Sequence, residues 1–199
     1  MFTWCNDIFH HLIEILLPIR DTPTGYTFTG FRGLASHGAV IGSLIGLYLY
    51  KRKFKFKPLL WIIDRVIIPV SIGASFVRIG NFFNSEIVGK YSGSNFGVVF
   101  LNRGENAARH PAQLYEALGY LVLFFILKQV YKTNKKDKPG YLLGVFFTCM
   151  FVIRFFVEYL KESQGGFEEY LPLLSTGQWL SIPFILLGLF LMLRKTNNQ

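Results

Sequence analysis

Apolar runs of nearly membrane-spanning length recur along this sequence, and they constrain its fold more than any other feature. A helix needs about 20 predominantly apolar residues to cross the hydrocarbon core of a bilayer. Inside the bilayer every backbone polar group needs an internal partner, which a helix provides. We therefore predict an all-α fold, a polytopic membrane helical bundle of about five transmembrane helices, over residues 36–50, 58–84, 111–131, 140–160 and 178–193.

The length of 199 residues fits one domain. We expect residues 1–199 to form a single integral membrane domain, with an N-terminal outer-face segment (1–35) before the transmembrane bundle (36–194). Residues 8–19 are apolar but interrupted by histidine, glutamate and proline, so they are too short and too polar to span. They predict an N-terminal interfacial helix. Residues 21–29 are rich in threonine, glycine and proline and predict a loop.

Clusters of lysine and arginine follow the first, third and fifth predicted spans. Alternating crossings place these clusters on one side of the membrane, which the positive-inside rule assigns to the cytoplasm. The C-terminus is then cytoplasmic, and the loops at 85–110 and 161–177 face outward. Because the net charge of +9 resides in these short clusters, it is typical of juxtamembrane loops, and no nucleic-acid partner is expected.

Polar and ionisable side chains from four predicted helices collect at the outer-face ends of those helices. His37 opens the first span. The end of the second span carries Arg78 and Asn81, and Glu86 follows it. The third and fourth spans contribute His110, Gln113, Tyr115, Glu116, Arg154 and Glu158. Ionisable residues in membrane helices are costly and mark functional sites. Their gathering at one face favours a common site, so an ion path through a transporter is the less favoured alternative.

Each of these residues also has a purely structural interpretation. Arg154 and Glu158 are four residues apart and can simply pair with each other. Arg78, near a helix end, can extend its guanidinium to lipid headgroups. Packing, helix-start or interhelical hydrogen-bonding roles are open to His37, Asn81 and His110.

The chemistry that these residues suit can be argued from their types. Two arginines at headgroup depth, Arg78 and Arg154, offer bidentate donors for a phosphate. A histidine at a helix N-terminus, such as His37, is biased toward its neutral form and can accept a proton. The two cysteines and the separated histidines form no metal-ligand spacing, so neither a metal nor a cofactor is expected. No GxSxG-type nucleophile turn is present, and an enzyme of this kind would take its nucleophile from the substrate.

Four motifs stand in a fixed order along the chain: GLASHGAVIG at 33–42, RIGNFFNSEIVG at 78–89, HPAQLYE at 110–116 and RFFVE at 154–158. In this order they resemble the prolipoprotein diacylglyceryl transferase family over nearly the whole chain. The resemblance implies transfer of the diacylglyceryl group of phosphatidylglycerol to the lipobox cysteine thiol of a prolipoprotein signal peptide, the first step of bacterial lipoprotein maturation. It also implies a multi-pass protein of the bacterial cytoplasmic (inner) membrane, with its active face toward the outer leaflet.

The resemblance suggests roles for individual residues. His37 matches the family's essential histidine, a proposed base for a thiol whose pKa of about 8.5 leaves it mostly protonated at neutral pH. Arg78 and Arg154 match its essential arginines, which would hold the lipid phosphate and stabilise the leaving phosphoglycerol. The further matching positions, assigned with Arg78 to substrate binding, are Asn81, Glu86, Gly89 and Glu158. Motif membership without an assigned role is carried over for His110, Gln113, Tyr115 and Glu116.

The family's first two helices have no counterpart before Met1. We therefore expect an N-terminally truncated copy of the family's fold. The alternative to an active transferase is an inactive remnant that binds phospholipid or a membrane partner.

Overall fold

The computed structural model describes residues 19–22, 25–28, 36–54, 57–93, 96–162 and 173–194. These residues belong to two compact units, Met1–Lys53 and Phe54–Gln199, which are described separately. The first unit contains a β-hairpin, in which Ile19 pairs with Phe28 across two antiparallel strands, β1 (Ile19–Thr22) and β2 (Gly25–Phe28).

The hairpin corrects one expectation. The sequence predicts a loop over residues 21–29, yet residues 25–28 form a strand. Their tyrosine, threonine and phenylalanine favour the pleated conformation, and this preference outweighs the turn signal of the neighbouring glycine and proline. The interfacial helix predicted over residues 8–19 lies outside the described residues, except for Ile19, which belongs to β1.

The first unit also contains α3 (Ser36–Phe54), apart from the last residue of that helix. The helix begins where the first span is predicted. Its last turn carries Lys51, Arg52 and Lys53, so its apolar part is shorter than a full span. It is not among the described helices that are both long and apolar enough to cross a membrane, and its crossing remains a prediction.

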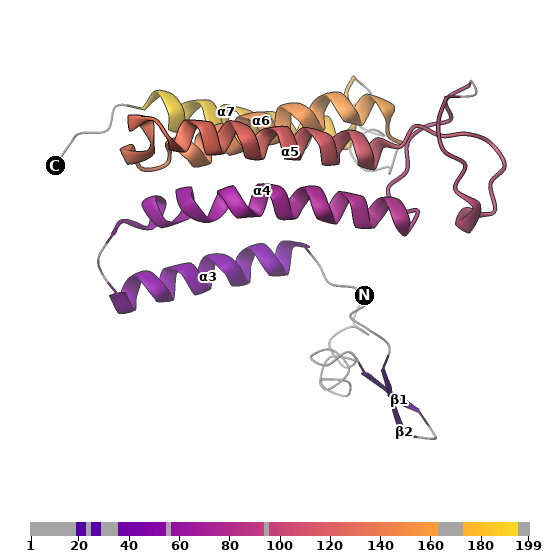
Figure 1. The fold of residues 1–199 in the computed structure, drawn as a ribbon, viewed down its shortest axis with the longest axis horizontal. Coiled ribbons are helices and arrows are strands. Elements are labelled where there is room, and N and C mark those ends of the chain that lie inside the picture. Colours follow the sequence, from indigo (N-terminus) through magenta and orange to yellow (C-terminus); the bar gives the residue numbers. More distant parts are fainter. Residues whose placement is uncertain are drawn as a thin grey trace. The chain divides into compact units, whose positions relative to one another are not determined.

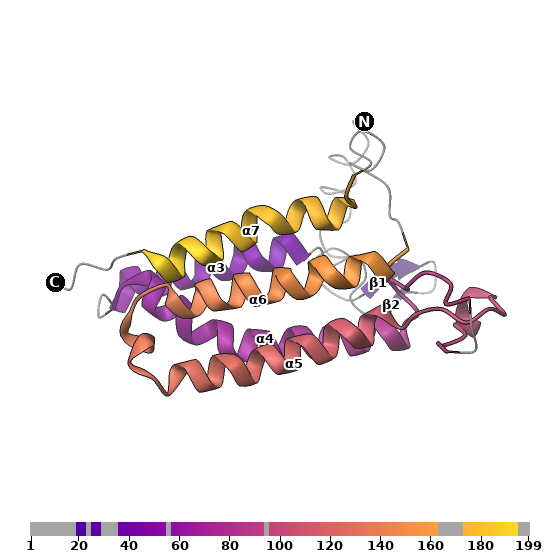
Figure 2. The ribbon, with the colours of Figure 1, turned by 90° about the horizontal axis from the view of Figure 1, so that it is seen from above.

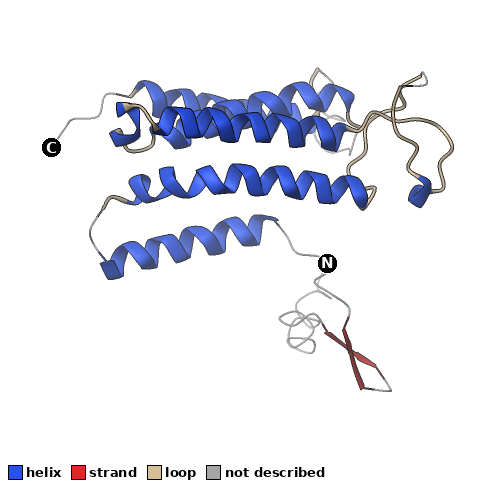
Figure 3. Cartoon of the chain, viewed as in Figure 1, coloured by secondary structure: helices blue, strands red, loops and turns tan. Residues whose placement is uncertain are grey.

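In the second unit, the described residues form four helices that are long and apolar enough to cross a membrane. They are α4 (Leu59–Phe83), α5 (Ala112–Tyr131), α6 (Tyr141–Val157), which the 3₁₀ turn η3 (Glu158–Leu160) extends, and α7 (Thr176–Leu193). All four run side by side, and α6 packs against α4, α5 and α7 (Figures 1, 2 and 3). The predicted helical membrane bundle is confirmed, and the bounds of these helices agree closely with those predicted.

Local chemistry explains where the helices begin. Pro58 is the N-cap residue of α4 and has an extended conformation, with φ −61° and ψ 148°. Proline suits a helix start because it lacks the amide hydrogen that the first turn would leave unpaired. Gly140 precedes α6 with a φ of 87°, which glycine adopts without a Cβ clash. Ser175 and Gln178 form a reciprocal capping box at the start of α7.

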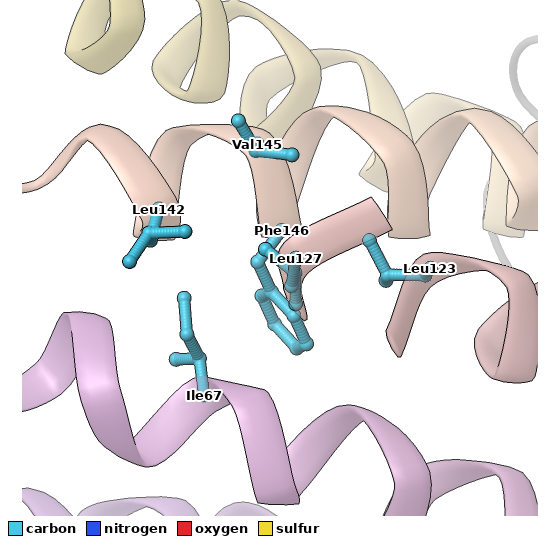
Figure 4. Close-up of a cluster of buried hydrophobic side chains, with 6 residues drawn as sticks. All are labelled: Ile67, Leu123, Leu127, Leu142, Val145 and Phe146. Carbon is cyan, nitrogen blue, oxygen red and sulfur yellow. The ribbon is translucent and has the colours of Figure 1, made fainter. Parts of the chain in front are cut away.

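The apolar core joins three of these helices (Figure 4). Its buried members are Ile67 from α4, Leu123 and Leu127 from α5, and Leu142, Val145 and Phe146 from α6. They lie in the half of the bundle that is remote from Arg78 along α4. This packing fixes the helices at one end, so the other end is free to carry polar groups.

The same half is also fixed by a buried carboxylate. Asp64 on α4 is fully buried and accepts hydrogen bonds from the backbone N–H groups of Gly140, at 2.6 Å, and Leu143, at 2.8 Å. It therefore satisfies amides at the start of α6, which that helix cannot pair internally. The next residue, Arg65, stacks on Trp61, with its guanidinium carbon 3.4 Å from the ring centroid.

Candidate active site

Several of the polar residues predicted from the sequence meet where α4 and α6 end and α5 begins. Arg78 lies near the end of α4, with a side chain 17% exposed. Its Nε is 2.9 Å from Oε2 of Glu116, a fully buried carboxylate on α5. Its Nη1 donates a hydrogen bond to Oδ1 of Asn81, at 3.3 Å. Arg78 is thus held by partners on two helices.

Asn81 and Gln113 extend these contacts to the residue that follows α4. Asn81 Nδ2 donates to Oε2 of Glu86 at 2.7 Å, and Gln113 Nε2 donates to the backbone carbonyl of Glu86 at 2.6 Å. Gln113 and Glu116 share one face of α5, because they are three residues apart. An ion pair and hydrogen bonds thus link Gln113 through Glu86, Asn81 and Arg78 to Glu116, and α5 itself joins the two ends. We call this set the polar ring: Arg78, Asn81, Glu86, Gln113 and Glu116.

The backbone on both sides of Glu86 is left-handed at residues other than glycine. The φ angles are 56° at Ser85 and 53° at Ile87. Such a conformation costs on the order of 1–3 kcal/mol at each residue and persists only where the surroundings enforce it. Here the amide of Glu86 donates to the carbonyl of Asn81 at 2.9 Å, while Gln113 holds the Glu86 carbonyl. Strain of this kind is concentrated at functional sites.

Lys161 joins Glu158 to the polar ring. Its side chain is buried, and its Nζ lies 2.8 Å from Oε1 of Glu116 and 3.5 Å from Oε2 of Glu158. Lys161 is not predicted from the sequence as a site residue, although its position three residues after Glu158 indicates a possible pair. The alternative in which Arg154 pairs with Glu158 is wrong, because no ion pair joins these two described residues, and Glu158 pairs with Lys161.

Arg154 reaches the same region from α6. The hydroxyl group of Tyr120 on α5 is close enough to Arg154, Arg78 and Glu116 to feel the charge of all three, which places Arg154 near the polar ring. The Nε of Arg154 is buried and has no hydrogen-bond partner among the described residues. A buried guanidinium donor without a partner is costly, so Arg154 offers a donor to an anionic ligand at this position.

Gly89 lies where three segments approach closely. Its amide donates to the carbonyl of His110 at 3.1 Å, and the next amide, of Lys90, donates to the carbonyl of Leu160 at 2.8 Å. A Cβ atom at Gly89 would lie 2.8 Å from both the Leu160 carbonyl oxygen and the His110 Cβ, so no larger residue fits. The structure thus gives Gly89 a packing role, and its contact with a substrate remains a prediction.

Arg109, which is likewise not predicted from the sequence, anchors the loop between α4 and α5. This loop extends beyond the helix ends (Figure 1). Arg109 is 3% exposed, donates to the Gly89 carbonyl at 3.0 Å, and stacks on Tyr91. It also donates to both carboxylate oxygens of Glu105 and pairs with Glu162 at 3.3 Å. Hydrogen bonds from Arg109 hold the pKa of the Glu105 carboxyl below its usual range.

Two predicted residues pair with each other rather than with the ring. The Nδ1 of His110 lies 3.4 Å from the hydroxyl of Tyr115, one turn into α5.

His37 is the second residue of α3, in the first unit, and its side chain lies outside the described part of the chain. Its proximity to Arg78 therefore remains a prediction.

The arrangement suits recognition of an anion. Arg78 and Lys161 neutralise Glu116 at its two oxygens, and an arriving phosphate can compete for the same donors, since arginine binds phosphate and carboxylate in similar bidentate geometry. In the described part of the chain, histidine, cysteine and acidic side chains form no group that could hold a metal ion.

Comparison with known proteins identifies the family. The family model described as "Prolipoprotein diacylglyceryl transferase" matches residues 8–194. The chain belongs to this family. The resemblance predicted from the four sequence motifs is therefore confirmed, and the whole polar ring lies within the matched region.

Individual members of the prolipoprotein diacylglyceryl transferase family are similar over most of this chain. The phosphatidylglycerol–prolipoprotein diacylglyceryl transferase of Bacteroides fragilis is 43% identical over 185 residues, which cover 92% of this chain and 66% of that protein. The protein of the same name from Tolumonas auensis is 45% identical over 167 residues, covering 84% of this chain and 64% of that protein. The chain thus spans just under two thirds of the length of these relatives.

Proposed function

We propose that this chain transfers the diacylglyceryl group of phosphatidylglycerol to the lipobox cysteine thiol of prolipoproteins. Membership of the family supports the reaction. The observation that carries the proposal is the polar ring, in which Arg78, only partly exposed, is held on the buried Glu116 at one end of a membrane bundle. A buried ion pair gains little stability over apolar packing, so a binding function explains it better.

In the proposed reaction, the thiol sulfur attacks the diacylglycerol carbon that carries the phosphate oxygen. A carbon–sulfur bond forms, the carbon–oxygen bond breaks, and glycerol phosphate leaves with the electron pair. The thiol proton passes to a base, for which His37 is the candidate. The reaction also requires that the negative charge on the leaving phosphate be stabilised. Guanidinium donors held at a fixed position provide this stabilisation.

The residues of the site divide between these tasks. Arg78 and Arg154 would hold the phosphate, Arg154 through the buried Nε that lacks a partner. Glu116 keeps Arg78 oriented until the lipid arrives, and Lys161 is placed to balance the charge of Glu116 when Arg78 turns to the phosphate. Asn81, Glu86 and Glu158 would support these donors around the bound headgroup.

The proposed reaction also implies a setting. The protein would lie in the bacterial cytoplasmic membrane with the polar ring toward the outer leaflet and its C-terminus in the cytoplasm. The basic turns on the opposite side, including Lys135 and Lys136 between α5 and α6, support this orientation through the positive-inside rule. The partners would be phosphatidylglycerol and the signal peptide of the prolipoprotein.

Transfer of radiolabelled lipid from phosphatidylglycerol to a lipobox peptide, catalysed by the full chain in liposomes, tests the proposal. We expect Arg78→Ala to lower the rate about a hundredfold or more, the usual cost of removing a preorganised donor to a developing charge. Arg103→Ala is the matched control, because that arginine is more exposed and pairs with loop carboxylates instead of the ring. Equal rates for Arg78→Ala, His37→Gln and the unchanged chain would refute the assigned roles.

Phospholipid binding without transfer is the second candidate function. The observation that favours it is the buried Nε of Arg154, which has no partner among the described residues, because this donor suits a phosphate whether or not transfer follows. The same liposome preparation separates the two candidates, because this function requires saturable phosphatidylglycerol binding that depends on Arg78, with no labelled peptide formed.

A further inference from the structure

Gln113 carries a buried hydrogen-bond acceptor that lacks a donor. Its side chain is fully buried, and its Nε2 donates to the Glu86 carbonyl at 2.6 Å. This bond fixes the orientation of the amide, since a flipped amide would place two acceptor oxygens against each other. The Oε1 atom therefore points elsewhere, and no described residue donates to it.

A second buried glutamine shows how the protein satisfies such a group when its role is structural. Gln178 on α7 is 2% exposed. Its Nε2 donates to the Phe155 carbonyl at 3.2 Å, and its Oε1 accepts from the Ser175 amide at 3.0 Å. Both ends of Gln178 are paired, whereas Gln113 is paired at one end. Unpaired buried polar atoms are rare in native proteins and each calls for a physical reason.

The surroundings of Gln113 define which donor fits. The neighbouring turn of α5 carries Glu116, whose charge is already neutralised by Arg78 and Lys161. An additional cation would be repelled by these two groups, so a neutral donor such as a hydroxyl is favoured. A lipid phosphate bound to Arg78 would place the headgroup that it carries at the polar ring.

We propose that Gln113 Oε1 accepts a hydrogen bond from a hydroxyl of the polyol headgroup of an anionic phospholipid, and so selects lipids that carry such a hydroxyl. The inference rests on the proposed function, because it assumes that the ring holds the lipid phosphate. It adds a specificity-determining residue to that site.

The test compares two lipids that differ only beyond the phosphate. Dioleoyl phosphatidylglycerol and dioleoyl phosphatidylmethanol share charge and acyl chains, but the second has no headgroup hydroxyl. Binding of each to the full chain is measured by native mass spectrometry from detergent micelles. We expect a preference for phosphatidylglycerol of roughly threefold to tenfold, as one neutral hydrogen bond gives. Gln113→Met, close in shape but without the acceptor, should abolish this preference.

Gln178→Met is the matched control, because it alters an equally buried glutamine whose oxygen is already paired. It should keep the preference. Equal affinity of the unchanged chain for the two lipids overturns the inference without any variant. So does a preference that survives in Gln113→Met, or a loss of affinity for both lipids alike, since the latter assigns Gln113 only to holding the Glu86 carbonyl.

The outcomes for the two proposals are separable. A preference for phosphatidylglycerol that requires Gln113, with no labelled peptide in the transfer assay, supports the role of Gln113 and contradicts the proposed transferase activity. Transfer that proceeds at equal rates from both lipids supports the transferase activity and contradicts the role of Gln113.

Discussion

Removal of the Asp64 carboxylate should destabilise the bundle more than any change to an exposed acidic residue. Asp64 projects from α4 to the start of α6 and is fully buried. Its oxygens accept the amide hydrogens of Gly140 at 2.6 Å and Leu143 at 2.8 Å. The perturbation Asp64→Ala removes both acceptors and leaves two amides unpaired in an apolar setting.

The magnitude follows from these two bonds. A hydrogen bond to a charged group contributes about 1.5–3 kcal/mol to stability, and a buried donor left without an acceptor costs about 1–3 kcal/mol. Since water cannot fully replace the carboxylate there, we expect Asp64→Ala to lower the free energy of unfolding by about 3–5 kcal/mol. Asp64→Asn keeps one acceptor oxygen, so its loss should be about half as large.

The assay is reversible unfolding in mixed detergent micelles, followed by circular dichroism as the share of denaturing detergent rises. The control is Asp137→Ala, because Asp137 lies exposed in the 3₁₀ turn η2 (Asn134–Asp137) between α5 and α6. A loss for Asp64→Ala that lies within about 0.5 kcal/mol of the control would refute the reasoning, since surface substitutions usually fall within that range.

Two further predictions concern the packing of α6 on α7 and the loop between α4 and α5. Gly188→Ala would place a methyl group 2.7 Å from the backbone carbonyl oxygen of Gly144 and 2.7 Å from the backbone nitrogen of Thr148. Backbone atoms cannot rotate away, so we expect about 1–3 kcal/mol of destabilisation in the same unfolding assay. Gly73→Ala, whose Cβ would meet nothing within 4 Å, should show no such loss. Because hydrogen bonds from Arg109 lower the pKa of Glu105 in the folded protein, their stabilisation of the loop is complete above the ordinary carboxyl pKa and is lost as pH falls through the lowered one. Pepsin cleavage of residues 89–110 should therefore rise with acidity in the unchanged chain, and an identical rise in Glu105→Gln would contradict this.

Local signals in the sequence predict most of the helix bounds. Pro58 marks a helix start through its restricted φ and Gly140 through its freedom to adopt a positive φ, and the length of the apolar runs sets the extent of the spans. Loop charges then order the helix ends, so Arg78 and Glu116 are expected at the same end before any contact is known. The hairpin at Ile19–Phe28 was not predicted, because turn-forming residues and strand-forming residues alternate there.

The contacts that sequence reasoning missed join residues that are far apart in the chain. Lys161 and Glu116 are 45 residues apart, and Asp64 and Gly140 are 76 residues apart. Each partner taken alone has an ordinary explanation, a juxtamembrane lysine or an interfacial aspartate. Only the packing of helices selects the pair, and the packing depends on side-chain shape across the interface, which periodicity does not encode.

In the described part of this bundle, the buried carboxylates of Asp64 and Glu116 are satisfied by different chemistry, and this difference separates a structural carboxylate from one suited to a function. Asp64 is bound by backbone amides of α6, which cannot turn to another partner without breaking the helix start. Glu116 is bound by the side chains of Arg78 and Lys161, which can rotate toward an arriving anion while one of them still neutralises Glu116. A buried carboxylate with two cations can therefore hold the guanidinium of Arg78 in place for the proposed phosphate without leaving any charge unpaired. This is why we expect substitution of Arg78 to lower the rate of the proposed transfer while the bundle remains folded, and substitution of the buried Asp64 to destabilise the bundle instead.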